Sequence, residues 1–460
     1  MLRTLATFRP DVVLQPEDGA LLLTHPWGAF RLRGLASSET ATLAGLANGG
    51  VDVSALAEIR AALRARLEPL VARTVVAGGR RLATAVPMAP DAVLRPATPV
   101  DAVRLAPFAY LRRPRDEVCA VLESPVARYR VLLHDASAAA AVGALSAGDA
   151  GPAKRYGLVD LLLATGLAAA EDAPEDPTLA LWDFHDLVFH ARSRLGRHDA
   201  PFGGVFRHLE THPPLPAVAP PLPGPFVELP RPDWSEVVAR DPKLTEALEG
   251  RRSIREYDAA PITLAQLAEL LYRTARVRGI VPADAEAGLP YDAVDRPFPT
   301  GGGSGELELY VTVARCDGLE PGVYHYEAAA HGLRRLDATE QDRVELLAAA
   351  WRSAAGRIDP QVLITITSRF GRLSWKYSAI AYALTLKHVG VLYQTLYLVA
   401  TAMGLAPCGL GSGDSDVAAR AFGLDWASES SVGEFLIGSR RVDAPGLPTA
   451  FADVVDATRS

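Results

Sequence analysis

Apolar and polar residues alternate near the start of the chain in three short segments, at residues 12–14, 20–23 and 29–32. Period-two alternation predicts β-strands, and turn-forming residues separate the three segments. Apolar residues then recur at helical spacing over residues 53–70, which predicts an amphipathic helix. Two adjacent glycines interrupt the apolar run that follows, as expected of a hairpin. Residues 1–92 are therefore expected to form a small module of strands, helices and a terminal hairpin.

The same order of polar and apolar positions returns after 99 residues, so that Phe30 aligns with Tyr129. Self-similarity at a fixed offset is typical of duplicated modules, although two small α+β modules can also share a pattern by chance. We therefore expect two related winged-helix-like modules, the first over residues 1–92 and the second over residues 100–215. Both alternatives, duplication and chance likeness, stay open at this point.

The composition changes near residue 213, where prolines become dense. Residues 216–232 are predicted to be a semi-rigid linker, because proline-rich segments are extended. Residues 233–460 are then predicted to form a third domain of α+β class with a long helix at about 379–403. Its expected strands have apolar, β-branched sequences and lie at residues 307–313, 323–326, 361–367 and 434–438.

Composition and charge exclude several classes of protein. The chain has 460 residues, 49% hydrophobic and 22% charged, with a formal net charge of −7. Nucleic acid is not expected as a partner, because phosphate binding needs clustered positive charge. Three cysteines at unrelated spacings suggest neither a disulfide framework nor a metal site. The N-terminus lacks the apolar core of a signal peptide, and no membrane span is expected, so a cytoplasmic location is predicted.

Four clusters in the third domain carry groups suited to a cofactor. Residues 251–257 combine arginines with a serine, which can hold a phosphate through charge-assisted hydrogen bonds. Residues 299–305 and 407–414 are glycine-rich, so their backbone can approach a planar ligand closely. Residues 438–441 add two arginines at the end of a strand. Each cluster alone is equally typical of a basic helix end, a loop or a helix cap.

Together, the order and spacing of these clusters resemble the FMN-binding pattern of the nitroreductase superfamily. The loop at 299–305 running into Leu307-Glu308-Leu309-Tyr310 is similar to that of the SagB-type dehydrogenases, which include the cyanobactin oxidases. Residues 182–194 are also typical of that subfamily. The resemblance implies a C-terminal FMN-binding nitroreductase fold preceded by two modules like the recognition elements of peptide-modifying enzymes.

The resemblance also implies roles for particular residues. Arg251, Ser253 and Arg255 would hold the FMN phosphate, with Arg440 assisting. Pro299, Thr300 and Gly301 would line the flavin ring, from the other subunit of a homodimer. Gly409 and Leu410 would present their backbone to the N5 edge of the ring. Gln394 occupies the place of a polar residue in the long helix, although the family more often has glutamine followed by asparagine there.

Lys376 and Tyr377 match a lysine–tyrosine pair that the azoline dehydrogenases carry. Aromatising a thiazoline or oxazoline removes one hydride and one proton, and the proton needs a general base. Free lysine and tyrosine are weak bases at neutral pH, but mutual burial can lower the pKa of the lysine or favour a tyrosinate. An ordinary helix start, with an exposed lysine and a packed tyrosine, is the alternative.

The leading hypothesis is an FMN-dependent oxidase that converts azolines to azoles in a ribosomally made precursor peptide. The first module is expected to bind the leader of that peptide as an added strand. A cyclodehydratase is a possible partner, because it would supply the ring. Two alternatives remain: an NAD(P)H-dependent reductase of nitro compounds or quinones, and a non-catalytic scaffold that docks peptide.

Overall fold

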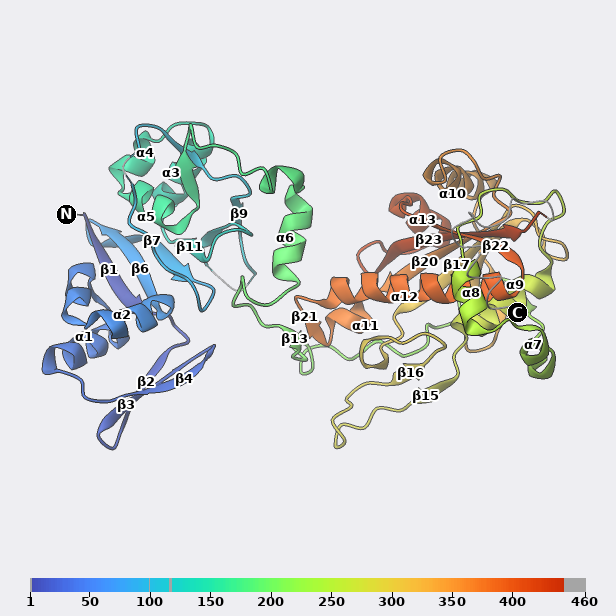
Figure 1. Cartoon of the computed structure of the whole chain (residues 1–460), viewed down its shortest axis with the longest axis horizontal. Helices are drawn as coiled ribbons and strands as arrows, with labels where there is room; N and C mark the ends of the chain where they lie inside the picture. The colour runs from blue at the N-terminus through green and yellow to red at the C-terminus, as the bar shows by residue number, and fades with distance from the viewer. Residues whose placement is uncertain (1, 99, 116–117, 442–460) are drawn as a thin grey trace. The chain divides into compact units, whose positions relative to one another are not determined.

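The computed structural model describes residues 2–98, 100–115 and 118–441, and the chain divides into two compact units (Figure 1). Unit 1 is Met1–Pro201 and unit 2 is Phe202–Ser460. The sequence instead predicts two modules ending near residue 215 and a linker at 216–232. The structure differs because both expected modules contribute strands to one sheet, while residues 203–204 and 226–228 pair with strands of unit 2.

The first half of unit 1 combines strands with short helices. Its elements are β1 (Leu2–Phe8), β2 (Val13–Glu17), β3 (Ala20–His25), β4 (Gly28–Leu32), α1 (Ser37–Ala47), β5 (Val51–Asp52), η1 (Val53–Glu58), α2 (Ala61–Leu67), η2 (Glu68–Leu70), β6 (Val71–Ala77) and β7 (Arg80–Pro87). The helix expected over 53–70 is broken, because the Glu39 carboxylate accepts a hydrogen bond from Arg60 N at 3.1 Å. The backbone is extended at Ile59, and α2 starts only after this contact.

The second half of unit 1 repeats the same order of elements. It contains β8 (Val103–Leu105), β9 (Tyr110–Arg112), β10 (Ala120–Glu123), β11 (Tyr129–Leu133), α3 (Ala136–Ser146), α4 (Gly151–Arg155), α5 (Leu158–Thr165), β12 (Ala168–Ala170), η3 (Leu179–Leu181) and α6 (Phe184–Arg192). Helix α3 begins and ends 99 residues after α1. The pairing also repeats: β8 with β12 corresponds to β1 with β6, and β9-β10-β11 corresponds to β2-β3-β4.

Strand β7 joins the two halves of unit 1. It pairs with β6 on one side and with β11 on the other, which gives a continuous antiparallel sheet in the order β5-β1-β6-β7-β11-β10-β9. One apolar core lies under α1 and α2, and another lies under α3 and α5. Among the described residues, β4 pairs only with β3, whereas β11 has β7 on its outer edge.

Unit 2 is an antiparallel sheet covered by helices on both faces. Its elements are β13 (Gly203–Gly204), β14 (Phe226–Glu228), α7 (Trp234–Arg240), α8 (Leu244–Gly250), α9 (Leu264–Ala275), β15 (Gly279–Val281), β16 (Ala293–Asp295), η4 (Gly301–Gly303), β17 (Leu307–Val313), β18 (Gly322–Glu327), β19 (Gly332–Arg335), α10 (Glu340–Ser353), β20 (Val362–Arg369), α11 (Gly371–Ser374), β21 (Tyr377–Ser378), α12 (Ala381–Ala402), β22 (Leu405–Leu410), α13 (Ser415–Phe422) and β23 (Glu429–Ser439).

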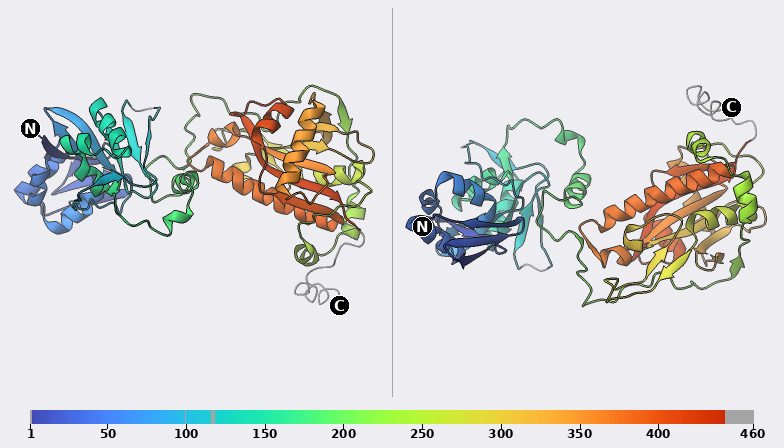
Figure 2. Two further views of the ribbon diagram at one scale, coloured as in Figure 1. Left: turned by 90° about the horizontal axis from the view of Figure 1, so that it is seen from above. Right: turned by 60° about the horizontal axis from the view of Figure 1, so that its bottom comes forward.

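The order of strands in the main sheet is β14-β19-β18-β17-β20-β23-β22. Every residue of β17 and β20 is buried, as expected of central strands with helices over both faces. Helices α9 and α12 share one core with the sheet, and α10 and α13 share another. Figure 2 shows α12 lying along one face of this sheet. In the described part of the chain, no helix is long and apolar enough to cross a membrane.

Candidate active site

Lys376 and Tyr377 lie in unit 2 between α11 and α12, close to the glycine-rich loop. The Lys376 ammonium donates a hydrogen bond to the Tyr291 hydroxyl at 2.5 Å. The Tyr291 hydroxyl in turn donates to the Gly302 carbonyl oxygen at 2.6 Å. Lys376 Nζ also lies 5.0 Å from the ring centroid of Tyr377 and 5.5 Å from that of Phe206. We call this group, Phe206, Tyr291, Gly302, Lys376 and Tyr377, the lysine cluster.

The surroundings of Lys376 keep its ammonium charged. Partial burial lowers the pKa of Lys376, but the hydrogen bond to Tyr291 and attraction to Tyr291 and Tyr377 outweigh it and raise the pKa above the ordinary value. Lys376 is therefore protonated at neutral pH and cannot itself take up a proton there. The sequence leaves open two candidates for the base, a lysine with a lowered pKa and a tyrosinate, and the structure disfavours the lysine.

The loop that carries Gly302 is fixed from both sides. Gly301 N donates to His388 Nε2 at 2.8 Å, and His388 Nδ1 lies 2.5 Å from the fully buried Glu306 carboxylate. Because Nε2 accepts the hydrogen bond from Gly301 N, the ring proton is on Nδ1, which donates a hydrogen bond to the Glu306 carboxylate. Thr300 Oγ1 accepts from Gly305 N at 3.1 Å. The loop therefore has a set conformation rather than a flexible one.

Gly302 has a conformation and a position that only glycine fits. Its φ angle is +64°, in the left-handed region. A Cβ atom there would lie 2.3 Å from Lys376 Nζ and 2.8 Å from the Tyr291 hydroxyl. The bare backbone therefore lets the lysine cluster close onto the loop.

A second group lies further along α12, around Tyr397. The Tyr397 hydroxyl lies 2.6 Å from Ser253 Oγ and accepts a hydrogen bond from Gly409 N at 2.7 Å. The Arg251 guanidinium lies over the Tyr397 ring, 5.1 Å from its centroid. On the same helix, the Tyr393 hydroxyl donates to the Leu410 carbonyl oxygen at 3.2 Å. Tyr397 thus ties the arginine segment to the end of β22, and we call this group the tyrosine cluster.

Positive charge gathers around the tyrosine cluster, where Arg441 is paired with Glu256 and the neighbouring arginines exceed the carboxylates. Burial and the neighbouring Arg440 guanidinium both lower the pKa of Arg252. Arg251, Arg255 and Arg440 form no ion pair with any residue that the structure describes. The backbone joins the two segments, because Tyr257 forms a β-bridge with Arg440. Like charges held together in this way favour a bound anion such as a phosphate.

The structure does not bring every predicted site residue into one place. Pro299, Thr300 and Gly301 adjoin the lysine cluster, whereas Arg251, Ser253, Arg255, Gly409, Leu410 and Arg440 adjoin the tyrosine cluster. His388 and Tyr397 mark the two clusters on α12, and nine residues of helix separate them by roughly 14 Å. Within one chain, the two halves of the expected site are therefore apart.

Two predicted roles change in the structure. Gly409 N donates to the Tyr397 hydroxyl, so this N–H is not directed toward a ligand as the sequence predicts. Gln394 is exposed on α12, and the neighbouring Tyr393 and Tyr397 make the contacts with β22 instead. Helical geometry explains the difference, because positions 393 and 397 share one face of the helix and position 394 points elsewhere.

Sequence reasoning missed Tyr291, Glu306, His388 and Tyr397. Tyr291 is 85 residues from Lys376, and His388 is 82 residues from Glu306, so no local spacing connects them. The one available signal was a polar residue beside an apolar segment: Glu306 directly precedes the strand at 307–313, and His388 lies within the long apolar helix. Such residues are buried mainly when they are paired.

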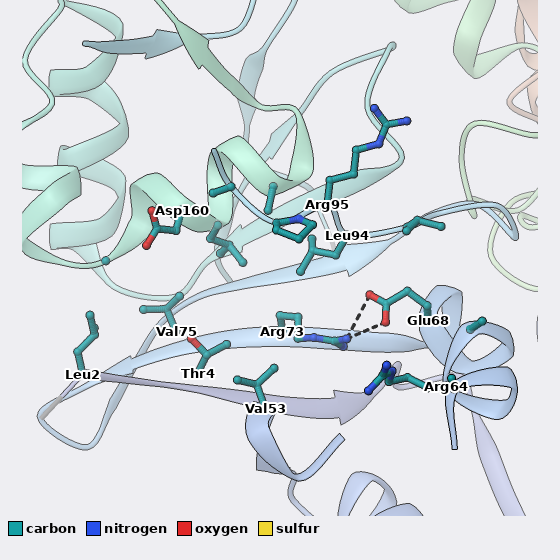
Figure 3. Close-up of a pocket in the computed structure, with 18 residues that line it drawn as sticks. Leu2, Thr4, Val53, Arg64, Glu68, Arg73, Val75, Leu94, Arg95 and Asp160 are labelled. Atoms are coloured by element: carbon teal, nitrogen blue, oxygen red, sulfur yellow. Dashed lines mark hydrogen bonds and ion pairs between the residues drawn. The ribbon is translucent and has the colours of Figure 1, made fainter. Parts of the chain in front are cut away.

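Unit 1 contains a separate candidate site, a groove of about 660 Å³ between α2 and α5. Strands β1 and β6 form its floor, and the segment at residues 93–97 lines one wall. Figure 3 shows Leu2 and Asp160 at one end of the groove, and Arg64, Glu68 and Arg95 at the other. We call this site the inter-helix groove.

Comparison with known proteins identifies the class of the chain. Residues 248–439 match the model of the nitroreductase family, and residues 103–199 match that of the cyanobactin oxidase ThcOx. A relative from Methanocaldococcus jannaschii that carries the name nitroreductase is 31% identical over 189 residues, covering 41% of this chain and 86% of the relative. The chain belongs to the nitroreductase family. The two matches together confirm the resemblance to the SagB-type dehydrogenases.

Comparison with solved structures finds matches at low identity. A structure named as a nitroreductase from Anabaena variabilis is 16% identical and covers 96% of this chain and 80% of its own, with a TM-score of 0.39. The Escherichia coli microcin synthetase McbBCD complex with truncated pro-MccB17 bound is 19% identical, covering 41% of this chain and 68% of its own, with a TM-score of 0.34. Neither likeness carries an argument about the chemistry of this chain.

Proposed function

We propose that the chain is an FMN-dependent oxidase that converts thiazoline or oxazoline rings to thiazoles or oxazoles in a ribosomally made precursor peptide. The observation that carries the proposal is the hydrogen-bonded series Lys376–Tyr291–Gly302, which joins the lysine–tyrosine pair to the glycine-rich loop. The fixed Lys376 ammonium beside Tyr377 supports a role for this pair in removing the ring proton.

FMN fits the groups that the chain provides. Arg251, Arg255 and Arg440 would hold its phosphate, since they form no ion pair with a described residue. Thr300 and Gly301 would line its ring, where the bare backbone of the loop leaves room. We propose that the two sets act together across a homodimer, because they lie apart on one chain. The exposed side chains of Tyr382, Leu386 and Val391 on α12 offer an apolar surface for the second copy.

The proposed chemistry divides one ring oxidation into two transfers. FMN, when bound, would supply the acceptor for the ring hydride, and molecular oxygen would take up the two electrons. The Tyr377 oxygen is the proposed acceptor of the ring proton. Lys376, fixed as an ammonium, stabilises the negative charge on Tyr377. Tyr291 is the positioning residue, because it fixes the ammonium while its own proton is donated to Gly302.

We also propose that unit 1 recognises the leader of the precursor peptide, and that a cyclodehydratase partner supplies the ring. The open edge of β4 is one surface of unit 1 where an extended chain could be added as a strand, because its N–H and C=O groups are unpaired among the described residues, and the inter-helix groove is a second surface. The equivalent edge in the second half is covered by β7.

The absorption spectrum of the purified chain tests the proposal. We expect a yellow protein whose flavin is bleached by an azoline-bearing peptide under anaerobic conditions and restored by oxygen. Bleaching by NAD(P)H without peptide would instead support a nitro or quinone reductase. A colourless protein that does not take up added FMN would support a peptide-docking scaffold and overturn the proposal.

A further inference from the structure

We propose that the inter-helix groove in unit 1 binds an extended peptide segment in which apolar residues precede carboxylates. The inference rests on the proposed function in one respect: it identifies this segment as part of the precursor peptide's leader. It differs from the sequence expectation, which places the leader at a strand edge.

The groove lies where the two halves of unit 1 meet, and equivalent helices form its walls. Ala61 and Ala65 of α2 line one side, and Asp160 and Ala164, which lie 99 residues further along the chain, line the other from α5. Equivalent faces of α2 and α5 thus line the two sides of the groove. The alanines leave the floor uncovered, so side chains of a bound segment can reach β1 and β6.

One end of the groove carries uncompensated positive charge. Arg73, on the floor, is buried and bonded through NH2 to both oxygens of Glu68 at 2.9 and 3.1 Å, so this pair is neutral overall. Arg64 lies at this end beside Glu68, and Arg95 lies in the wall segment at the same end with its side chain extending away from Arg64 (Figure 3); neither forms an ion pair with a described residue. Carboxylates of a ligand would therefore be attracted to this end.

The rest of the groove is apolar and unusually open to solvent. Leu2, Val53 and Val93 line it with 52%, 39% and 61% of their surface exposed. Burying such side chains under a ligand is favourable, at about 25 cal/mol per Å² of apolar area. At the opposite end from the arginines, Asp160 is an exposed carboxylate that suits a ligand's amino group. A peptide would therefore bind in one orientation, with its amino group near Asp160, its apolar residues over the apolar surface and its carboxylates near the arginines.

Main-chain pairing within unit 1 sets how a ligand can lie. β1 is paired with β5 and β6, and β6 is paired with β1 and β7, so no strand can be added between them. A ligand must therefore lie on the face of the sheet and be recognised through its side chains. The β4 edge offers backbone groups but little apolar surface, and its Arg31 is already paired with Glu17 at 2.6 Å. The inter-helix groove can therefore distinguish peptide sequences by their side chains better than the β4 edge can.

A fluorescein-labelled synthetic peptide tests the inference by fluorescence anisotropy on the full chain. The probe has a leucine- and alanine-rich half followed by glutamates, and a second probe has lysines in place of the glutamates. We expect the acidic probe to bind and the basic probe not to bind. The double variant R64E/R95E should weaken binding roughly tenfold or more, while the matched exposed pair R104E/R155E should not. Failure of the acidic probe to bind, or equal effects of the two double variants, would overturn the inference.

Photo-crosslinking locates the bound probe without depending on a change in affinity. A photoreactive residue at Val53 should crosslink to the acidic probe, and one at Ala29, on the β4 edge, should not. The reverse result would assign binding to the strand edge and overturn the inference. Both experiments are read without flavin or turnover, so their outcome is separate from that of the oxidase proposal. Oxidation of a leaderless azoline peptide by R64E/R95E reports on the oxidase alone.

Discussion

The Lys376 ammonium and the Tyr291 hydroxyl are 2.5 Å apart, although 85 residues separate them in the chain. This contact raises the pKa of Lys376 despite partial burial. Since the Tyr291 proton is donated to Gly302, Tyr291 faces Lys376 as an acceptor. The pair fixes an ammonium beside Tyr377 and the glycine-rich loop.

Replacing Tyr291 with phenylalanine should alter the pH dependence of turnover. The hydroxyl raises the pKa of Lys376, so its removal lowers that pKa, and the ammonium is lost at a lower pH. We expect the alkaline limb of the kcat profile to move to lower pH and the maximal rate to fall roughly tenfold. Tyr272→Phe, on α9 and outside the lysine cluster, is the control. An unchanged profile would remove Tyr291 as a positioning residue.

Replacing Gly302 with alanine should disrupt the loop. The left-handed backbone costs a non-glycine residue about 1–2 kcal/mol, and the new Cβ would displace Lys376 Nζ. Thermal unfolding should show a lower midpoint, and turnover should fall more than stability alone explains. Gly279→Ala is the matched control, because its φ is not positive and nothing lies within 4 Å of the added Cβ. Equal effects at the two glycines would contradict the account.

Neutralising arginines of the tyrosine cluster should weaken FMN binding. For Arg251→Gln and Arg440→Gln, we expect a loss of roughly tenfold each in FMN affinity, measured by fluorescence titration, because each removes a charge-assisted bond to phosphate. The affinity of the unaltered chain should also fall with salt. Arg357→Gln, at an exposed site on the chain, serves as the control. If riboflavin and FMN bind equally well, the arginines do not hold a phosphate.

Glu434 should make the stability of unit 2 depend on pH. Burial raises the pKa of Glu434 to about 7, above its usual 4.5. The folded state therefore binds this proton more tightly than the unfolded state, so stability falls as pH rises from about 4.5 to 7. Glu434→Gln removes the charge and should stabilise the chain at pH 8 by up to roughly 3 kcal/mol, with little effect near pH 4.5. Denaturant unfolding at the two pH values measures this, and an equal effect at both would contradict the assignment.

The central strands and the long helix of unit 2 could be predicted from the sequence. The strand expected at 307–313 is β17, and the helix expected at about 379–403 is α12 at Ala381–Ala402. β17 is largely apolar and buried along its whole length, whereas α12 buries one face and leaves the other exposed. The break at Ile59 in unit 1 could not be predicted, because a distant carboxylate, Glu39, competes with the helical hydrogen bonds.

The site was predictable only where its residues adjoin in sequence. Lys376 and Tyr377, like the segment at 299–305, can be recognised as motifs. Tyr291, by contrast, comes next to Lys376 only through the fold, so a pattern along the chain gives no sign of it. The separation of the two clusters along α12 is likewise set by His388 and Tyr397, neither of which the sequence singles out.

Mass spectrometry of an azoline-bearing peptide incubated with the chain, FMN and oxygen tests the central claim most directly. We predict that each azoline ring loses the mass of two hydrogens, and that Lys376→Met and Tyr377→Phe each slow this roughly 100-fold while the flavin stays bound. Full turnover in both variants with flavin bound, or an unchanged peptide mass with the flavin-loaded unaltered chain, would contradict it.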